Sequence, residues 1–204
     1  MSTPLPREFF MRDPVACARE LIGCTLVWGK CAGVIVETEA YSAIADEACH
    51  TWTRPSARAF VAARPPGAAY VYFNYGMYWM LNVLIKNGTA DGFVLFRAIE
   101  PTEGLAAMRR RRTAARRKST APLPPTSLCS GPGKLAQALG VTGRDHGRDF
   151  CAENGASFFS PCEIKPVIAD TRIGISSAKH LPWRFLLAGS AHVSVPPQIK
   201  RPDR

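Results

Sequence analysis

Short runs rich in β-branched and aromatic residues predict that the chain folds mainly as strands. In one of these runs, Val34 and Val36 alternate with Ile35 and Glu37, as the two-residue period of a strand requires. A final β-rich stretch begins at Phe158. The predicted strands before it cover residues 24–30, 33–41, 69–75, 78–86 and 93–100.

Helix signals lie between and beside these runs. Asp13 followed by Pro14 is typical of a helix start, with Asp13 as N-cap. Further helices are predicted near 57–63, from Pro101 into the arginine-rich run, and over 130–140. Regular alternation of strands and helices is missing, so a doubly wound fold is not expected. We predict an α+β fold, in which peripheral helices surround a curved, mainly antiparallel sheet.

Length and composition fit one globular domain over residues 1–204. Hydrophobic residues make up 47% of the chain, which argues against general disorder. Within this domain we expect 109–125 to be a basic, Pro-rich, mobile segment and 196–204 to be a loose tail.

The formal net charge is +10, which favours nucleic acid or an anionic membrane surface as the partner. No apolar run approaches the ~20 residues that span a bilayer. The first fourteen residues include Arg, Glu and Asp, where a signal peptide needs an apolar core. We therefore expect a soluble, cytoplasmic protein without a membrane partner.

The seven cysteines are scattered, and none forms a CxxC pair. Zinc ligands usually come in such close pairs, so a metal site is not expected. The cysteines fall in apolar patterns, where free thiols pack as small hydrophobic groups. Reduced and mostly buried thiols are the expectation.

Two carboxylates in VETEAY are the first candidates for chemistry. Glu37 and Glu39 would point to one face of a strand, with Thr38 on the other. From the residues alone, a solvated acidic face on an edge strand is as good an interpretation as a catalytic one. In the catalytic interpretation, one Glu is a general base or nucleophile whose pKa depends on burial and on a cation such as Arg97. Hydrolysis of a glycosidic bond needs such a carboxylate.

Tyrosines crowd the segment AAYVYFNYGMYW. Aromatic residues at alternate strand positions usually pack across strands, and that interpretation stays open here. They are equally suited to stack on an extruded base, while Tyr75 beside Gly76 enters the gap left in the duplex. His50, in DEACH, is as a single residue more typical of a structural role than of a catalyst.

Two further segments are suited to DNA phosphates. Seven positive charges lie between Arg109 and Lys118, on nearly all sides of any helix formed there, so this run is not an amphipathic core element. A solvated arm and a phosphate contact are both compatible with it. In SGPGKL, the spacing of a phosphate loop is absent, but the Gly-rich helix start and Lys134 are suited to a backbone phosphate.

In this order, VETEAY, DEACH, PGAAYVYFNYGMYWMLNV, LFRAIEPTEG, CSGPGKLAQALG and RIGIS resemble the alkyladenine (3-methyladenine) DNA glycosylases of the mammalian type. The resemblance runs from about Phe9 to Val195. It implies a single mixed α/β domain that flips a damaged nucleotide out of duplex DNA and hydrolyses its N-glycosidic bond, without metal or cofactor. It also implies a monomer that acts on double-stranded DNA containing a damaged purine.

The resemblance also implies roles for single residues. Glu39 resembles the general base that activates water, and Arg97 the residue that helps hold this water. The resemblance implies that Tyr41 and Tyr72 sandwich the flipped base, with His50 at its edge. The resemblance also implies that Asn82 excludes guanine and that Tyr75 intercalates in the stack. From their charge and position, Lys134, Arg109 and Arg110 are the expected contacts to the DNA backbone.

One stretch departs from the family pattern. Residues 51–66 lack the Arg-Asn and Met-Phe pieces expected there, which concerns the rim of the pocket more than the chemistry. A catalytically inactive nucleic-acid-binding module with the same fold is the alternative function, and a scaffold whose tyrosines are all core is the third.

Overall fold

The computed structural model describes residues 3–115, 123–152 and 155–198. The α-helices are α1 (Pro14–Glu20), α2 (His50–Thr53), α3 (Pro55–Ala63), α4 (Leu105–Ala114), α5 (Pro125–Leu128) and α6 (Pro132–Leu139), with 3-10 helices at Arg7–Phe10 and Gly143–Asp145. The strands are β1 (Thr25–Trp28), β2 (Cys31–Ser42), β3 (Ala69–Asn74), β4 (Tyr78–Ile85), β5 (Gly92–Glu103), β6 (Ala156–Phe159), β7 (Val167–Asp170) and β8 (Arg184–Leu187).

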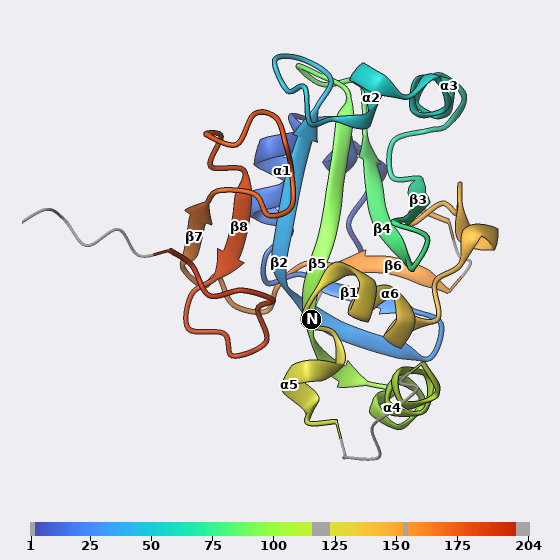
Figure 1. Cartoon of the computed structure of the whole chain (residues 1–204), viewed down its shortest axis with the longest axis vertical. Helices are drawn as coiled ribbons and strands as arrows, with labels where there is room; N and C mark the ends of the chain where they lie inside the picture. Colours follow the sequence, from blue (N-terminus) through green and yellow to red (C-terminus); the bar gives the residue numbers. More distant parts are fainter. Residues whose placement is uncertain (1–2, 116–122, 153–154, 199–204) are drawn as a thin grey trace, which may run out of the picture.

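All eight strands join one antiparallel sheet in the order β3-β4-β5-β2-β1-β6, and β8 extends it by pairing with both β2 and β7. The long strands β2 and β5 run through the middle of the molecule (Figure 1). Strands β7 and β8 flank them on one side and the β3–β4 hairpin on the other, with α2 and α3 at one end and α4 and α5 at the opposite end. The predicted α+β class with a curved antiparallel sheet is confirmed. Within the described ranges, no helix combines the length and apolarity that a bilayer crossing would need.

Local sequence signals explain where the helices begin and end. The Asp13 carboxylate accepts hydrogen bonds from the amides of Val15 and Ala16, both at 2.9 Å, which confirms the predicted N-cap. Gly140, with φ of 76°, ends α6 in the left-handed conformation that glycine tolerates best.

The helix predicted from Pro101 begins later than expected. Residues 101–103 extend β5, because they pair with the start of β2, and α4 begins only after Gly104. Pro125, the last residue of the segment 109–125 that was expected to be mobile, occupies the first turn of α5, where its missing amide costs nothing.

The arginine run is less exposed than its pattern predicted. Arg112 is buried because its guanidinium donates to the Leu128 carbonyl at 3.1 Å and to Gln137 at 2.5 Å. Arg111 donates to the Ala138 carbonyl at 2.8 Å. Two of the four arginines in RRRR thus donate to carbonyls at the ends of α5 and α6. Helical periodicity alone does not predict these contacts. Residues 116–122 of the segment 109–125, and 199–204 of the tail, lie outside the described residues.

The two faces of the sheet carry different clusters. The main core gathers side chains of α1, α6 and one face of the central strands, and there the Thr38 hydroxyl donates to the Ala18 carbonyl at 2.8 Å. Five of the seven cysteines are buried, as expected. A smaller cluster packs α3 against the other face through Phe60, Tyr70 and Phe93. This second face also carries Glu39 and opens into a cavity.

Candidate active site

Four adjacent strands form the floor of one cavity of about 560 Å³. Each strand contributes alternate residues to this floor, because successive side chains along a strand point to opposite faces of the sheet. These are Glu39 and Tyr41 of β2, Phe93, Leu95 and Arg97 of β5, Met80 and Asn82 of β4, and Tyr70, Tyr72 and Asn74 of β3. The cross-strand register agrees, because Asn82 pairs with both Leu95 and Tyr70. The walls come from α2 and the following residues, from the loop 173–177, and from Pro132 at the start of α6.

Glu39 lies fully buried at this floor, where it accepts two hydrogen bonds and forms one ion pair. Its Oε1 accepts from the Ile173 amide at 2.7 Å and lies 3.1 Å from Nη1 of Arg97. Its Oε2 accepts from the Tyr41 hydroxyl at 2.8 Å. A carboxylate has about four acceptor positions, so Glu39 keeps capacity for one more donor. The interpretation of a solvated acidic face is wrong, because β2 is a central strand and Glu39 is shielded from bulk water.

Arg97 connects the two carboxylates of VETEAY. Its Nε donates to Glu37 at 2.9 Å while its Nη1 faces Glu39. The β2–β5 ladder shifts register between Ile35 and Thr38, in the region where Arg97 lies, and such irregularities commonly re-aim side chains. Burial by itself lowers the pKa of Arg97, but the charges of Glu39 and Glu37 outweigh it and the pKa is raised. Arg97 is therefore a permanent cation.

Sequence reasoning missed the rest of this ion cluster. Glu37 also accepts from Arg184 at 3.1 Å, and from the hydroxyl and amide of Ser194 at 2.9 and 2.5 Å. Arg184 also donates a hydrogen bond to the Asp170 carboxylate at 2.6 Å. The one available signal was chemical, because two buried carboxylates need more positive charge than a single arginine supplies. Which arginine supplies it depends on a contact 147 residues apart in the chain.

A second buried ion pair lies behind Tyr41. Arg172, from RIGIS, binds Asp46 through two 2.7 Å hydrogen bonds, and both side chains are inaccessible to solvent. The Arg172 guanidinium carbon lies 4.7 Å from the centre of the Tyr41 ring. Burial, followed by the charge of Glu39, raises the pKa of Tyr41, so its hydroxyl keeps its proton and donates to Glu39. Tyr41 is fixed at both its ring and its hydroxyl.

Tyr72 lines the cavity and packs against other aromatic rings. The centre of its ring lies 4.5 Å from that of His50, and the Tyr70 hydroxyl is 3.1 Å from Nδ1 of His50. Burial, and then the charge of Arg54, lower the pKa of His50 to about 4. His50 is thus a neutral ring at physiological pH. Tyr70, which sequence reasoning left without a role of its own, stacks on Phe93 with 4.3 Å between ring centres.

Asn82 is buried on the cavity side of β4. Its amide nitrogen donates to the Tyr70 carbonyl at 3.0 Å, which fixes the orientation of the side chain. The cavity therefore contains a polar group that cannot turn freely.

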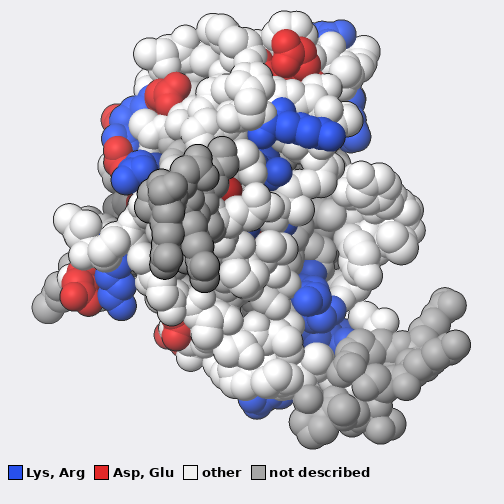
Figure 2. Space-filling view, turned by 60° about the vertical axis from the view of Figure 1, so that its left-hand side comes forward, with Lys and Arg blue, Asp and Glu red and all other residues white. Residues whose placement is uncertain are grey.

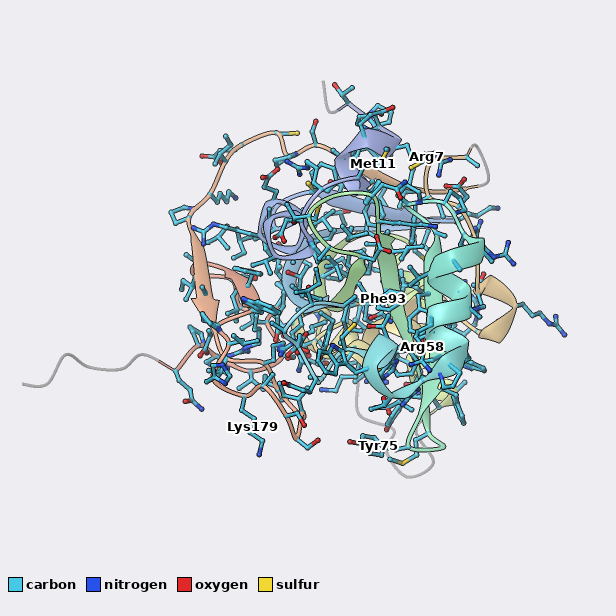
Figure 3. All side chains as sticks on the ribbon, turned by 90° about the horizontal axis from the view of Figure 1, so that it is seen from above. Arg7, Met11, Arg58, Tyr75, Phe93 and Lys179 are labelled. Atoms are coloured by element: carbon cyan, nitrogen blue, oxygen red, sulfur yellow. The ribbon has the colours of Figure 1, made fainter. Side chains whose placement is uncertain are left out.

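Tyr75 stands at the tip of the β3–β4 turn and is 78% exposed. Its φ is 50°, a left-handed conformation that a bulky residue rarely adopts without a functional reason. Figure 3 shows it at the edge of the molecule, beyond the side chains of the sheet, whereas Phe93 lies inside. Tyr75 also lines the mouth of the cavity. Neighbouring Met77 is 61% exposed, so the tip presents an apolar projection to solvent.

The three basic residues predicted for the DNA backbone lie outside the cavity. Lys134 is exposed in the first turn of α6, two positions after Pro132 of the cavity wall. Arg109 and Arg110 are exposed on α4, at the far end of the molecule from α2 and α3 (Figure 1). The basic side chains visible in Figure 2 form several separate groups rather than one continuous patch.

Ligands for a metal ion do not gather in the described ranges, where no cluster of three His, Cys, Asp or Glu side chains occurs. The model of the family "Methylpurine-DNA glycosylase (MPG)" matches residues 8–191. The chain belongs to the methylpurine-DNA glycosylase family.

Curated relatives of this family agree over nearly the whole chain. A protein of Rhodopseudomonas palustris (strain ATCC BAA-98 / CGA009) is 45% identical over 192 residues, which cover 94% of this chain and 88% of the relative. One of Nitrosospira multiformis is 40% identical and covers 100% of this chain and 99% of its own length. One of Rubrobacter xylanophilus is 41% identical, covering 88% and 90%. All three carry the name "Putative 3-methyladenine DNA glycosylase".

The family match includes the departing stretch at 51–66. In the glycosylase fold this stretch forms most of α2 and α3, which close one side of the cavity. The residues that differ from the expected motifs therefore belong to the cavity wall. The floor of the cavity, where Glu39 lies, is formed by other residues.

Proposed function

We propose that this chain excises a damaged purine from DNA by hydrolysing the N-glycosidic bond, with Glu39 as the general base. The main support for the proposal is the environment of Glu39. A fully buried carboxylate, bound by a permanent cation, lies at the floor of a cavity lined by aromatic rings. A pure binding module has no use for a buried charge of this kind, which is costly to desolvate.

The chemistry needs only one carboxylate. A water molecule that donates to the free acceptor position of Glu39 is oriented toward C1′ of the sugar and loses its proton to Glu39 as it attacks. The C1′–N bond breaks, its electron pair leaves with the base, and the water oxygen takes its place on C1′. Arg97 and Tyr41 hold Glu39 in position, and the negative charge of Glu39 stabilises the oxocarbenium-like sugar.

The base must leave the duplex to reach this floor. We propose that the purine flips into the cavity and stacks between Tyr41 and Tyr72, with the neutral ring of His50 at its edge. Tyr75 enters the gap in the stack, which explains why an exposed aromatic ring is kept at a left-handed position. Asn82, with its amide fixed on Tyr70, is placed to oppose the exocyclic amine of guanine.

The charge of the chain favours DNA as the substrate, and the residues that line the cavity favour a monofunctional enzyme. The net charge of +10 attracts the phosphate backbone, with Lys134, Arg109 and Arg110 as contacts. No lysine is among the described residues that line the cavity, so no amine is placed there to form a Schiff base with the sugar. We propose that the chain acts as a monomer, as its resemblance to the family implies.

Base release from lesion duplexes tests the proposal. Duplexes containing hypoxanthine, 3-methyladenine, 7-methylguanine or ethenoadenine are incubated with the wild type, with Glu39→Gln and with the control Glu103→Gln, an exposed carboxylate on β5. We expect release by the wild type and the control, and a loss of about 10²–10⁴-fold in Glu39→Gln with DNA binding retained.

The alternative, an inactive nucleic-acid-binding module, predicts salt-dependent binding by all three proteins and no release from any lesion. Wild-type rates in Glu39→Gln would leave an active enzyme but disprove the assignment of the base. The assay therefore distinguishes an inactive binding module from an active enzyme in which Glu39 is not the base.

A further inference from the structure

Arg54 has no place in the chemistry described so far, yet it lines the cavity. It links α2 to α3 and is held there by its backbone, whose amide donates to the His50 carbonyl at 2.8 Å and whose carbonyl accepts from the Ala57 amide at 3.0 Å. Pro55 follows it and fixes the start of α3. The position of its Cα is thus set by two helix ends rather than by a loose loop.

The side chain of Arg54 reaches the base-binding part of the cavity. Its guanidinium carbon lies 5.4 Å from the centre of the Tyr72 ring. Its charge lowers the pKa of His50, after the larger effect of burial. A base stacked on Tyr72 would therefore lie within several ångströms of a guanidinium group.

Arg54 also differs from the other arginines at the site by its lack of an acidic partner. Arg97 and Arg172 are each paired with a carboxylate, whereas no carboxylate in the described ranges pairs with Arg54. The remaining acidic residue of the cavity wall is Glu47, which is exposed and so is screened by solvent and salt. His50 is neutral and adds no charge.

A guanidinium group is a donor without acceptors and never loses its charge. Purines damaged by deamination, such as hypoxanthine, are neutral and present acceptors at O6 and N7. Purines alkylated at N7 carry a positive charge and have no acceptor at N7. A guanidinium whose charge is not balanced by a carboxylate interacts favourably with the first class of stacked base and repels the second.

We propose that Arg54 is a specificity-determining residue that favours neutral, acceptor-bearing purines over cationic alkylated ones. The inference rests on the function proposed above and names its preferred substrate class. A charge at about 5–9 Å in a partly hydrated cavity changes the preference by roughly five- to tenfold.

Two lesions that share O6 test the proposal. Single-turnover base release is measured on duplexes that differ only in hypoxanthine or 7-methylguanine, with the wild type, Arg54→Gln and Arg54→Lys. In Arg54→Gln we expect the ratio of the hypoxanthine rate to the 7-methylguanine rate to fall about five- to tenfold. Arg54→Lys keeps the charge, so its ratio should stay nearer the wild-type value.

Arg58→Gln is the matched control. Arg58 lies one turn further along α3, is exposed, and donates to the Thr51 carbonyl rather than lining this cavity. Figure 3 shows it against the helix ribbon. Its loss should change both rates by the same factor. A wild-type ratio in Arg54→Gln overturns the proposal, including when both rates fall together through misfolding. Absence of release by the wild type from every lesion overturns the proposed function as well.

Discussion

Replacement of Glu37 by Gln tests whether the ion cluster beneath the site supports both the fold and Glu39. Four donors converge on the two oxygens of Glu37, from Arg97, from Arg184 and from the amide and hydroxyl of Ser194. Glutamine offers one oxygen and replaces the other with a second donor. Arg97, Arg184 and the Ser194 hydroxyl donate to Oε1, whereas the Ser194 amide donates to Oε2. If the glutamine oxygen takes the place of Oε1, the Ser194 amide faces the new NH2 group and loses its acceptor.

The cost follows from this count. One buried N–H left without an acceptor costs about 1–3 kcal/mol, and the two arginine hydrogen bonds whose acceptor loses its charge weaken by about 1 kcal/mol each. The free energy of unfolding should therefore fall by about 3–5 kcal/mol, the range typical of removing one partner of a buried ion pair. In a chain of 204 residues this lowers the Tm by roughly 6–20 °C.

Urea unfolding followed by circular dichroism measures the loss, and Glu20→Gln is the control. Glu20 pairs with Arg12 at 2.7 Å, but both side chains are well exposed, so its replacement should cost less than about 1 kcal/mol. Equal stability of the two variants would refute the argument from burial.

A second readout concerns the site. Without the Glu37 carboxylate, Arg97 loses one of the two partners that hold it against Glu39. We expect base release per folded molecule to fall by about tenfold, because a less firmly held Arg97 positions Glu39 less accurately. A destabilised variant with unchanged release would show that the cluster serves only the fold.

Three more predictions concern single groups. Tyr75→Ala should reduce base release from duplex DNA without lowering the Tm, because the exposed ring packs little and alanine leaves the left-handed backbone as it is; a lower Tm would instead identify the ring as core. Replacing Lys134, Arg109 or Arg110 by Ala should weaken binding to damaged and undamaged duplexes alike and reduce the slope of log K against log salt by about 1 each, and a slope that does not change excludes that residue as a phosphate contact. His50 has a folded pKa of about 4, below its ordinary 6.5, so the unfolded chain takes up the proton first, and stability should be lost as pH falls from 6.5 to 4. Urea unfolding at pH 7 and pH 4.5 should show a smaller loss in His50→Gln than in the wild type, and equal losses would contradict the shift.

The sequence by itself determined the first five strands, the facing residues of β2 and the family. The period of two assigned Glu37 and Glu39 to one face and Thr38 to the other, and the structure agrees. Asp13 and Gly140 predicted helix ends through their own backbone chemistry. Such features depend on neighbours within a few residues, so they can be read without knowing the fold.

Tertiary structure decided everything that depends on pairing between distant segments. Whether Glu39 is buried depended on β2 lying in the middle of the sheet, which no local pattern specifies. The first three residues of the helix expected from Pro101 became strand because β2 pairs with them, and the helix begins at Leu105. The arginines were the least predictable residues. Arg112, Arg184 and Arg54 look alike in the sequence, and only the groups that fold against each one make it a structural, an ion-paired or a cavity-lining cation.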